Sequence, residues 1–123
     1  KSTGMAIRNK IQDDANELFH EYNRVELIKK YIHDNIKSDL RATIISQKFE
    51  LSISSLQHLF KKYEGQSYRH YLEDTRMTKA FELITKEGKR INEAMYATGY
   101  DNRATFNAAF KKRFKHHPGH FRK

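Results

Sequence analysis

Apolar residues recur along most of the chain at the three- and four-residue spacing that is typical of amphipathic helices. The spacing predicts a helical region over 11–36, as one broken helix or two, then helices over 42–49, 53–64, 67–85, 91–98 and 102–114 and a last helical turn over 118–121. We find no convincing strand pattern. The sequence therefore predicts an all-α fold of about seven helices.

Residues with cap and turn preferences mark the ends of these helices. Ser52 and Ser67 are suited to cap the helices that follow them, and Gly65, Gly88 and Gly99 are suited to end or join helices. The order of short helix, turn and amphipathic helix occurs twice. The expected organisation is a linker or extra helix at 1–23, a first helix-turn-helix subdomain at 24–66, a linker helix at 67–86 and a second helix-turn-helix subdomain at 87–123.

The two expected subdomains share residues at an offset of fifty positions. The matching pairs are Leu56 with Phe106, Phe60 with Phe110, Lys61 with Lys111, Lys62 with Lys112 and Tyr71 with Phe121. The short helices align only when the second turn has one extra residue. We infer two diverged copies of one unit. In the first copy we expect an inward face that consists of Ile53, Leu56, Leu59, Phe60 and Tyr63.

A helix-turn-helix unit can place its second helix in the major groove of DNA. A linker helix over 67–85 would be about 28 Å long, which is close to the ~34 Å repeat of B-DNA. One chain could then insert two recognition helices into successive major grooves. A flexible linker of the same span would not fix the relative phase of the two helices.

The charge distribution favours a polyanionic partner. The chain has 24 Lys and Arg against 15 Asp and Glu, and the excess belongs to residues 41–123, which hold 17 basic and 8 acidic residues. No acidic residue follows Asp101. Such a one-sided field attracts nucleic acid first, and an acidic protein or anionic membrane is the alternative partner.

The polar faces of the two expected recognition helices carry side chains suited to reading bases. On the first helix we expect base contacts from Ser54, Gln57 and His58, and Gln57 can pair with adenine through two hydrogen bonds. On the second helix, Arg103 suits guanine and Asn107 suits adenine.

Other polar residues on the same helices are expected to contact phosphates, which fixes the register of the protein without reading sequence. These residues are Ser55, Lys61, Lys62, Thr105, Lys111 and Lys112. For each lysine, an ordinary solvated position is the alternative.

Enzyme chemistry has no residues to support it in this sequence. There is no cysteine, P-loop, dinucleotide fingerprint or serine elbow. His116, His117 and His120 lie close together, but no nearby carboxylate completes a metal site. No apolar run approaches the ~18 residues of a membrane span. We therefore expect a cytoplasmic protein that is not an enzyme and that uses no cofactor, metal or membrane.

Residues 91–122, INEAMYATGYDNRATFNAAFKKRFKHHPGHFR, resemble the C-terminal signature of the AraC/XylS transcription regulators. The likeness rests on Gly99-Tyr100, Phe106, the triplet Phe110-Lys111-Lys112, Pro118 and the closing Phe121-Arg122. Upstream, LFKKYEGQS at 59–67 and RMTKAFELI at 76–84 resemble the family's first recognition helix and its linker helix.

This resemblance covers about residues 24–123. It implies a seven-helix domain with two helix-turn-helix units that binds double-stranded promoter DNA in a bacterial regulator. Members of the family usually activate transcription, often by contacting RNA polymerase, and less often repress it.

Several positions depart from the family pattern, Lys115 and Ala108 among them. Lys115 stands where members usually have glycine or a residue that tolerates a left-handed turn, so we expect the helix before it to fray or cap differently. Ala108 occupies a base-facing place where some members carry a long polar side chain. We therefore expect the second unit to depend on Arg103 and Asn107.

Longer members of the family carry an effector-binding or dimerising domain before the DNA-binding one, and no part of this chain corresponds to it. The apolar spacing of the first ~23 residues could pair two chains or pack onto the same domain. Because the pattern covers fewer than four heptads, we favour packing onto the same domain and leave dimerisation open.

Overall fold

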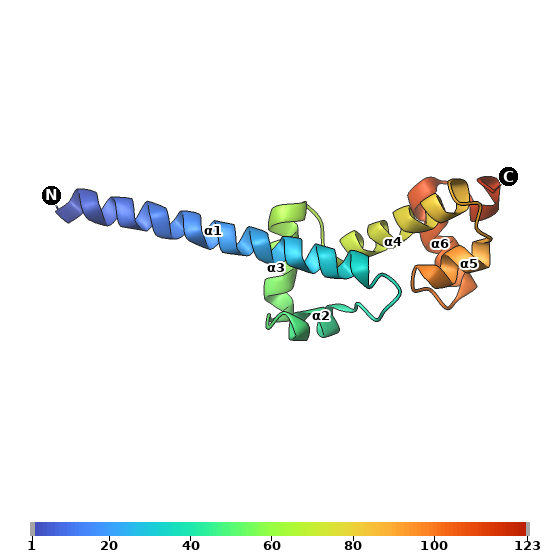
Figure 1. The fold of residues 1–123 in the computed structure, drawn as a ribbon, viewed down its shortest axis with the longest axis horizontal. Coiled ribbons are helices and arrows are strands. Elements are labelled where there is room, and N and C mark those ends of the chain that lie inside the picture. Colours follow the sequence, from blue (N-terminus) through green and yellow to red (C-terminus); the bar gives the residue numbers. More distant parts are fainter. Residues whose placement is uncertain (1, 123) are drawn as a thin grey trace.

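The computed structural model describes residues 2–122, with side chains from residue 7 onward. This part of the chain has helices and turns and no strand, which confirms the all-α prediction. The elements are α1 (Ser2–Asp34), α2 (Ala42–Lys48), α3 (Ile53–Glu64), α4 (Tyr68–Thr85), α5 (Ile91–Ala97), α6 (Arg103–Phe114) and the 3-10 helix η1 (Pro118–His120). Figure 1 shows a long α1 that enters a first lobe, which α4 joins to a second.

α1 is one continuous helix of 33 residues, about 50 Å long at 1.5 Å per residue. The sequence left open one broken helix or two, and the helix passes through residue 23 without interruption. Its N-terminal half projects away from the rest of the molecule (Figure 1). Only its C-terminal half packs on the first lobe.

The apolar side chains in the projecting half of α1 are exposed to solvent. Ile11 and Phe19 each expose 62% of their surface, and Leu18 exposes 48%. The expectation that this segment packs onto the same domain is therefore wrong for residues 7–20, all of which are exposed. The physical reason is that an unbroken helix carries these residues past the edge of the lobe.

The first lobe buries the C-terminal half of α1 against α2, α3 and the start of α4. Its buried residues are Val25, Ile28, Ile32, Leu40, Ile45, Leu56, Leu59, Phe60, Tyr68 and Tyr71. The Tyr68 hydroxyl donates to the carbonyl oxygen of Leu40 at 2.6 Å, so the buried phenol is satisfied.

Two apolar residues of the first lobe are exposed, and one of them, Ile53, was expected on the inward face. Leu27 exposes 59% of its surface, because the neighbouring Ile28 occupies the side of α1 that faces the core. Ile53 exposes 45%, because it is the first residue of α3 and lies one turn before Leu56 enters the core.

The second lobe packs α5, α6 and η1 on the C-terminal half of α4. Its buried residues are Met77, Ala80, Leu83, Ile84, Ala94, Met95, Phe106, Ala109 and Phe110. The rings of Phe81 and Phe114 stack with centroids 4.6 Å apart, and Phe121 meets Phe81 edge-on at 5.1 Å. α4 therefore contributes its two ends to two separate cores.

The internal repeat predicted from the sequence recurs in the backbone. Between α2 and α3 lie four residues, 49–52, and between α5 and α6 lie five, 98–102, which confirms the extra residue in the second turn. α3 ends at Gly65 with φ 71°, and α6 ends fifty residues later at Lys115 with φ 70°. The expectation of a different cap at the end of α6 is wrong, since the Lys115 N–H donates to the carbonyl oxygen of Lys111 at 2.8 Å, as the Gly65 N–H donates to that of Lys61 at 3.2 Å.

Candidate nucleic-acid interface

α3 is the second helix of the first helix-turn-helix unit and carries the first set of expected DNA contacts. Its N-terminus is capped by Ser52, whose Oγ accepts the N–H of Ser55 at 3.0 Å. Ser54, Gln57 and His58 are all exposed, at steps of three and four on the side of α3 away from the core. The structure thus brings the three expected base readers of α3 onto one surface.

The residues of α3 expected to contact phosphate differ in their exposure and in whether another side chain already binds them. Ser55 is half-buried, and its Oγ accepts from the Ser52 hydroxyl at 2.9 Å. The Nζ of Lys62 pairs with Oε1 of Glu21 in α1 at 2.8 Å, and this hydrogen bond lowers the pKa of Glu21. Lys61 is exposed and forms no ion pair within residues 7–122, so it is the freer of the two lysines.

A groove of about 740 Å³ lies between α1 and the start of α3. Ser54 and His58 line it on the α3 side, whereas Asp13, Glu17 and Glu21 line it on the α1 side. Carboxylates opposite two expected base readers make this end of the surface less positive than the rest. The sequence did not predict the groove, because it exists only if α1 continues unbroken beside α3.

α6 carries the second set of expected contacts. Asn102 caps it, with Oδ1 accepting the N–H of Thr105 at 2.9 Å. Arg103 is exposed, and its Nη1 donates to Oδ1 of Asn92 in α5. Asn107 is half-buried, and its Oδ1 is enclosed without a hydrogen-bond partner. An unpaired buried acceptor is costly, and rotating the Asn107 amide toward the surface would let this oxygen meet a donor.

The three residues of α6 expected to contact phosphate are exposed, but they do not share one side of the helix. Lys111 continues the stripe of Arg103 and Asn107 at a step of four. Lys112 instead faces α4, where it shares a hollow with Asp74 and Arg113. Lys111 therefore lies on the same side of α6 as the expected base readers, whereas Lys112 lies on the side that faces α4.

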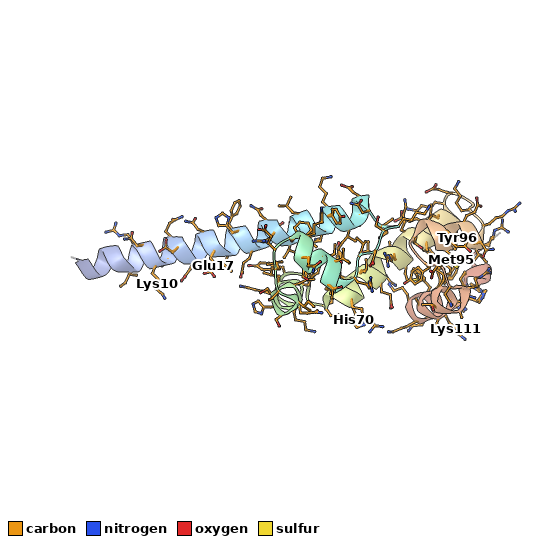
Figure 2. The ribbon with its side chains drawn as sticks, turned by 90° about the horizontal axis from the view of Figure 1, so that it is seen from below. Lys10, Glu17, His70, Met95, Tyr96 and Lys111 are labelled. Atoms are coloured by element: carbon orange, nitrogen blue, oxygen red, sulfur yellow. The ribbon has the colours of Figure 1, made fainter. Side chains whose placement is uncertain are left out.

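α3 and α6 lie on the same side of the molecule. In Figure 2, α3 is seen nearly end-on, and it lies along the same lower edge as the part of α6 around the labelled Lys111. The helix between the two lobes, α4, is unbroken over 18 residues, about 27 Å at 1.5 Å per residue. The stretch expected to form the linker helix is therefore a single continuous helix.

Arg76, in the middle of α4, connects the two lobes. Its Nη2 donates to the carbonyl oxygen of Ser38 at 2.7 Å and its Nε to that of Ile36 at 3.2 Å, both in the segment after α1. The same guanidinium lies over the ring of Tyr100 in the second lobe, with Cζ 6.0 Å from the ring centroid. Burial lowers the pKa of Arg76, and the two carbonyl oxygens compensate the buried charge.

Arg76 was not among the residues singled out from the sequence, although a signal was present. Leu72, Arg76 and Ala80 follow one another at steps of four, so a charge interrupts an apolar stripe of α4. Such a charge needs polar partners. The polar partners of Arg76 are carbonyl oxygens in the segment after α1. That segment is far from Arg76 in the sequence, and helical periodicity relates only residues a few positions apart.

The C-terminal histidines support the local fold. Nδ1 of His117 accepts the N–H of Gly119 at 3.1 Å and so caps η1. The rings of His116 and His120 stack with centroids 4.0 Å apart. Among the residues whose side chains are described, no group of three metal-ligating side chains comes together. Within the same range, no helix has the length and apolar character to cross a membrane.

Known proteins share this sequence and this arrangement of helices. A family model described as a helix-turn-helix domain matches residues 45–123. The Msm operon regulatory protein of Streptococcus mutans is 33% identical over 99 residues, which cover 80% of this chain and 36% of that protein. The transcriptional activator Btr of Bacillus subtilis is 29% identical over 86 residues, which cover 70% of this chain and 16% of that protein.

Among solved structures, the C-terminal domain of the response regulator yesN from Fusobacterium nucleatum superposes with a TM-score of 0.76 at 28% identity, covering 82% of this chain and 99% of that one. The chain spans about a third of the length of the Msm regulatory protein and less than a fifth of the length of Btr. The matches confirm the resemblance carried by residues 91–122. The chain therefore belongs to the AraC/XylS family and contains that family's helix-turn-helix DNA-binding domain.

Proposed function

We propose that this domain binds double-stranded promoter DNA in a sequence-specific way, with α3 and α6 in two successive major grooves. The observation that carries the proposal is that both helices lie on one side of the molecule and are held apart by an unbroken α4. A helix of about 27 Å is close to the ~34 Å repeat of the major groove. The contacts of Arg76 with both lobes oppose their independent rotation.

Base recognition is assigned to exposed or half-buried polar side chains on the outer faces of these helices. Ser54, Gln57 and His58 read bases from α3, and Arg103 and Asn107 read bases from α6. Asn92 supports the role of Arg103, because its Oδ1 accepts from the guanidinium and orients it.

Phosphate contacts add affinity without sequence preference. We assign them to Ser55, Lys61, Lys62, Thr105, Lys111 and Lys112. Lys61 and Lys111 contribute most, because both are exposed and lie beside the base readers. Lys62 contributes less, because it must leave Glu21 to meet a phosphate.

We also propose that the regulator containing this domain activates transcription in the bacterial cytoplasm and contacts RNA polymerase. Activation is supported by the name of the Btr relative. Contact with RNA polymerase is supported by the family resemblance alone.

Selection of bound duplexes from a random double-stranded library tests the proposal. We expect two short motifs whose centres lie about one helical turn, roughly 10 base pairs, apart. If some 6 to 10 phosphates are contacted, affinity should fall by ~10³ to 10⁵ between 50 and 200 mM salt. Salt-sensitive binding with no enriched motif would contradict the proposal and favour a basic surface for an acidic protein or membrane.

A further inference from the structure

The second lobe has a hollow of about 450 Å³ beside the start of its recognition helix. It is lined by residues from three places in the chain, namely Arg90, Ile91, Asn92 and Glu93 around the start of α5, Arg103 at the start of α6, and Arg122. Three of the six side chains are guanidinium groups, and one is a carboxylate. The hollow also adjoins Arg103, one of the proposed base readers.

Ion pairs within residues 7–122 do not balance the positive charges around this hollow. Oε1 of Glu93 accepts the backbone N–H of Arg90 at 2.9 Å, and Arg103 donates to the neutral amide of Asn92. Among residues 7–122, none of Arg90, Arg103 and Arg122 forms an ion pair. Three cations beside one carboxylate leave a local excess that attracts an anion.

The corresponding place in the first lobe differs in how its arginine is paired. Arg41 directly precedes α2 as Arg90 directly precedes α5. The guanidinium of Arg41 is already held by Asp39, with Nε to Oδ1 at 3.0 Å and Nη2 to Oδ2 at 2.8 Å. At the start of α3, Ile53 stands where α6 has Arg103. The uncompensated charge therefore belongs to the second lobe.

We infer that Arg90 and Arg122 together hold one phosphate group of the DNA backbone in this hollow, next to Arg103. The inference rests on the proposed DNA binding. Guanidinium groups donate paired hydrogen bonds to phosphate oxygens, and two of them that line one hollow can donate to the same phosphate group. A phosphate held here fixes where α6 enters the groove, while Arg103, oriented by Asn92, remains free to reach a base.

The test compares four forms of the full chain: wild type, Arg90→Ala, Arg122→Ala and the double variant. Each is titrated with a duplex obtained by selection and with a scrambled duplex, between 50 and 200 mM salt. Each single substitution should weaken binding to both duplexes by the same factor, about tenfold, and should lower the slope of log K against log salt by about one. If the two arginines share one phosphate, the double variant should lose less than the product of the single losses.

Lys89→Ala is the matched control, since Lys89 adjoins Arg90 and carries the same charge but does not line the hollow. It should weaken binding only about twofold, through the general field. The phosphate site would be overturned if Arg90→Ala and Arg122→Ala lost no more DNA affinity than Lys89→Ala. If the wild-type chain still bound DNA, the proposed function would stand. A loss confined to the selected duplex would also overturn the phosphate site, because it would make the two arginines base readers.

Inorganic phosphate at constant ionic strength distinguishes a free anion from a DNA phosphate. Chemical shifts of the arginine Nε–H groups should not saturate with inorganic phosphate in the range where the duplex saturates them. If the hollow saturates with inorganic phosphate and neither substitution affects DNA binding, the ligand is a free anion and the inference is wrong. A wild-type chain that binds no duplex would remove the proposed function and this inference together.

Discussion

Gly99 of the second lobe lies directly against the carbonyl oxygen of Ile36 in the first lobe. A β-carbon on Gly99 would come within 3.0 Å of that oxygen and within 3.0 Å of Nη2 of Arg76. Gly99 also has a φ of 90°, which L residues rarely adopt. The turn of the second helix-turn-helix unit is therefore part of the contact that holds the two lobes in place.

Replacing Gly99 with alanine should loosen this contact. We expect Gly99→Ala to lower the free energy of unfolding by about 2 kcal/mol or more, from left-handed backbone strain and from the clash with a backbone oxygen. Urea denaturation measures the loss. DNA affinity should also fall, because the lobes shift relative to each other.

Gly88→Ala is the control for the Gly99 prediction. Gly88 has a φ of 66°, but a β-carbon there meets nothing within 4 Å, so only backbone strain of about 1 kcal/mol is expected. Equal losses for the two variants would show that the contact between the lobes does not constrain Gly99.

Replacing Lys115 with glycine should stabilise the domain. Lys115 holds a left-handed φ of 70° that its counterpart Gly65 adopts without penalty. Release of this strain, less the greater freedom of glycine in the unfolded chain, should raise the free energy of unfolding by roughly 0.5 to 1 kcal/mol. Thermal unfolding should show a higher Tm for Lys115→Gly and a lower one for Gly65→Ala. An unchanged or lower Tm for Lys115→Gly would contradict the assignment.

Substitutions of base-reading and of phosphate-contacting side chains should differ in their effect on DNA sequence preference. Arg103→Ala and Asn107→Ala should each cost ~1 to 3 kcal/mol on the selected duplex and relax the preference at particular base pairs. Lys111→Ala should weaken all duplexes by a similar factor. Competition binding against single-base variants of the site measures both effects, and the reverse pattern would show that α6 is rotated from the proposed orientation.

The two lysines at the end of α3 should contribute unequally to DNA binding. Lys61→Ala should weaken binding severalfold more than Lys62→Ala, because Lys62 is engaged by Glu21 in the free protein. Glu21→Gln releases Lys62 and should strengthen binding at low salt. Asp14→Asn makes the same change in net charge on an exposed part of α1 and is the control. Equal effects of these two carboxylate substitutions would mean that only the overall charge matters.

Core and projecting residues of the chain should respond differently to truncation. Leu56→Ala removes a fully buried side chain and should cost ~2 to 5 kcal/mol of stability. Ile11→Ala removes a side chain that is 62% exposed and should change stability by less than about 0.5 kcal/mol. Denaturant titration at low protein concentration compares them. A large loss for Ile11→Ala that grows with protein concentration would reveal pairing of two chains through α1.

Much of the helical architecture follows from local sequence. The serines at 52 and 67 cap helices as expected, and the α4 predicted to end at Thr85 does so. The fifty-residue repeat, including its extra turn residue, also appears in the backbone. These features are accessible because capping, helical periodicity and turn length depend on residues only a few positions apart.

The course of α1 could not be predicted from the same signals. Ile11 and Ile28 both follow helical apolar spacing, yet the first is exposed and the second is fully buried. Periodicity identifies a face of a helix but not what covers it. The same limit applies to Lys62, whose pairing with Glu21 depends on where α1 crosses α3.

Local and additive properties of the sequence are enough to predict the helices, their caps, the duplicated unit and the basic character of the second two thirds of the chain. Tertiary packing was needed to show that α1 is unbroken, that Arg76 contacts both lobes and that Arg90, Arg103 and Arg122 line one hollow. Those features bring together residues far apart in the chain. Their positions depend on how the two cores pack around α4, which no local pattern encodes.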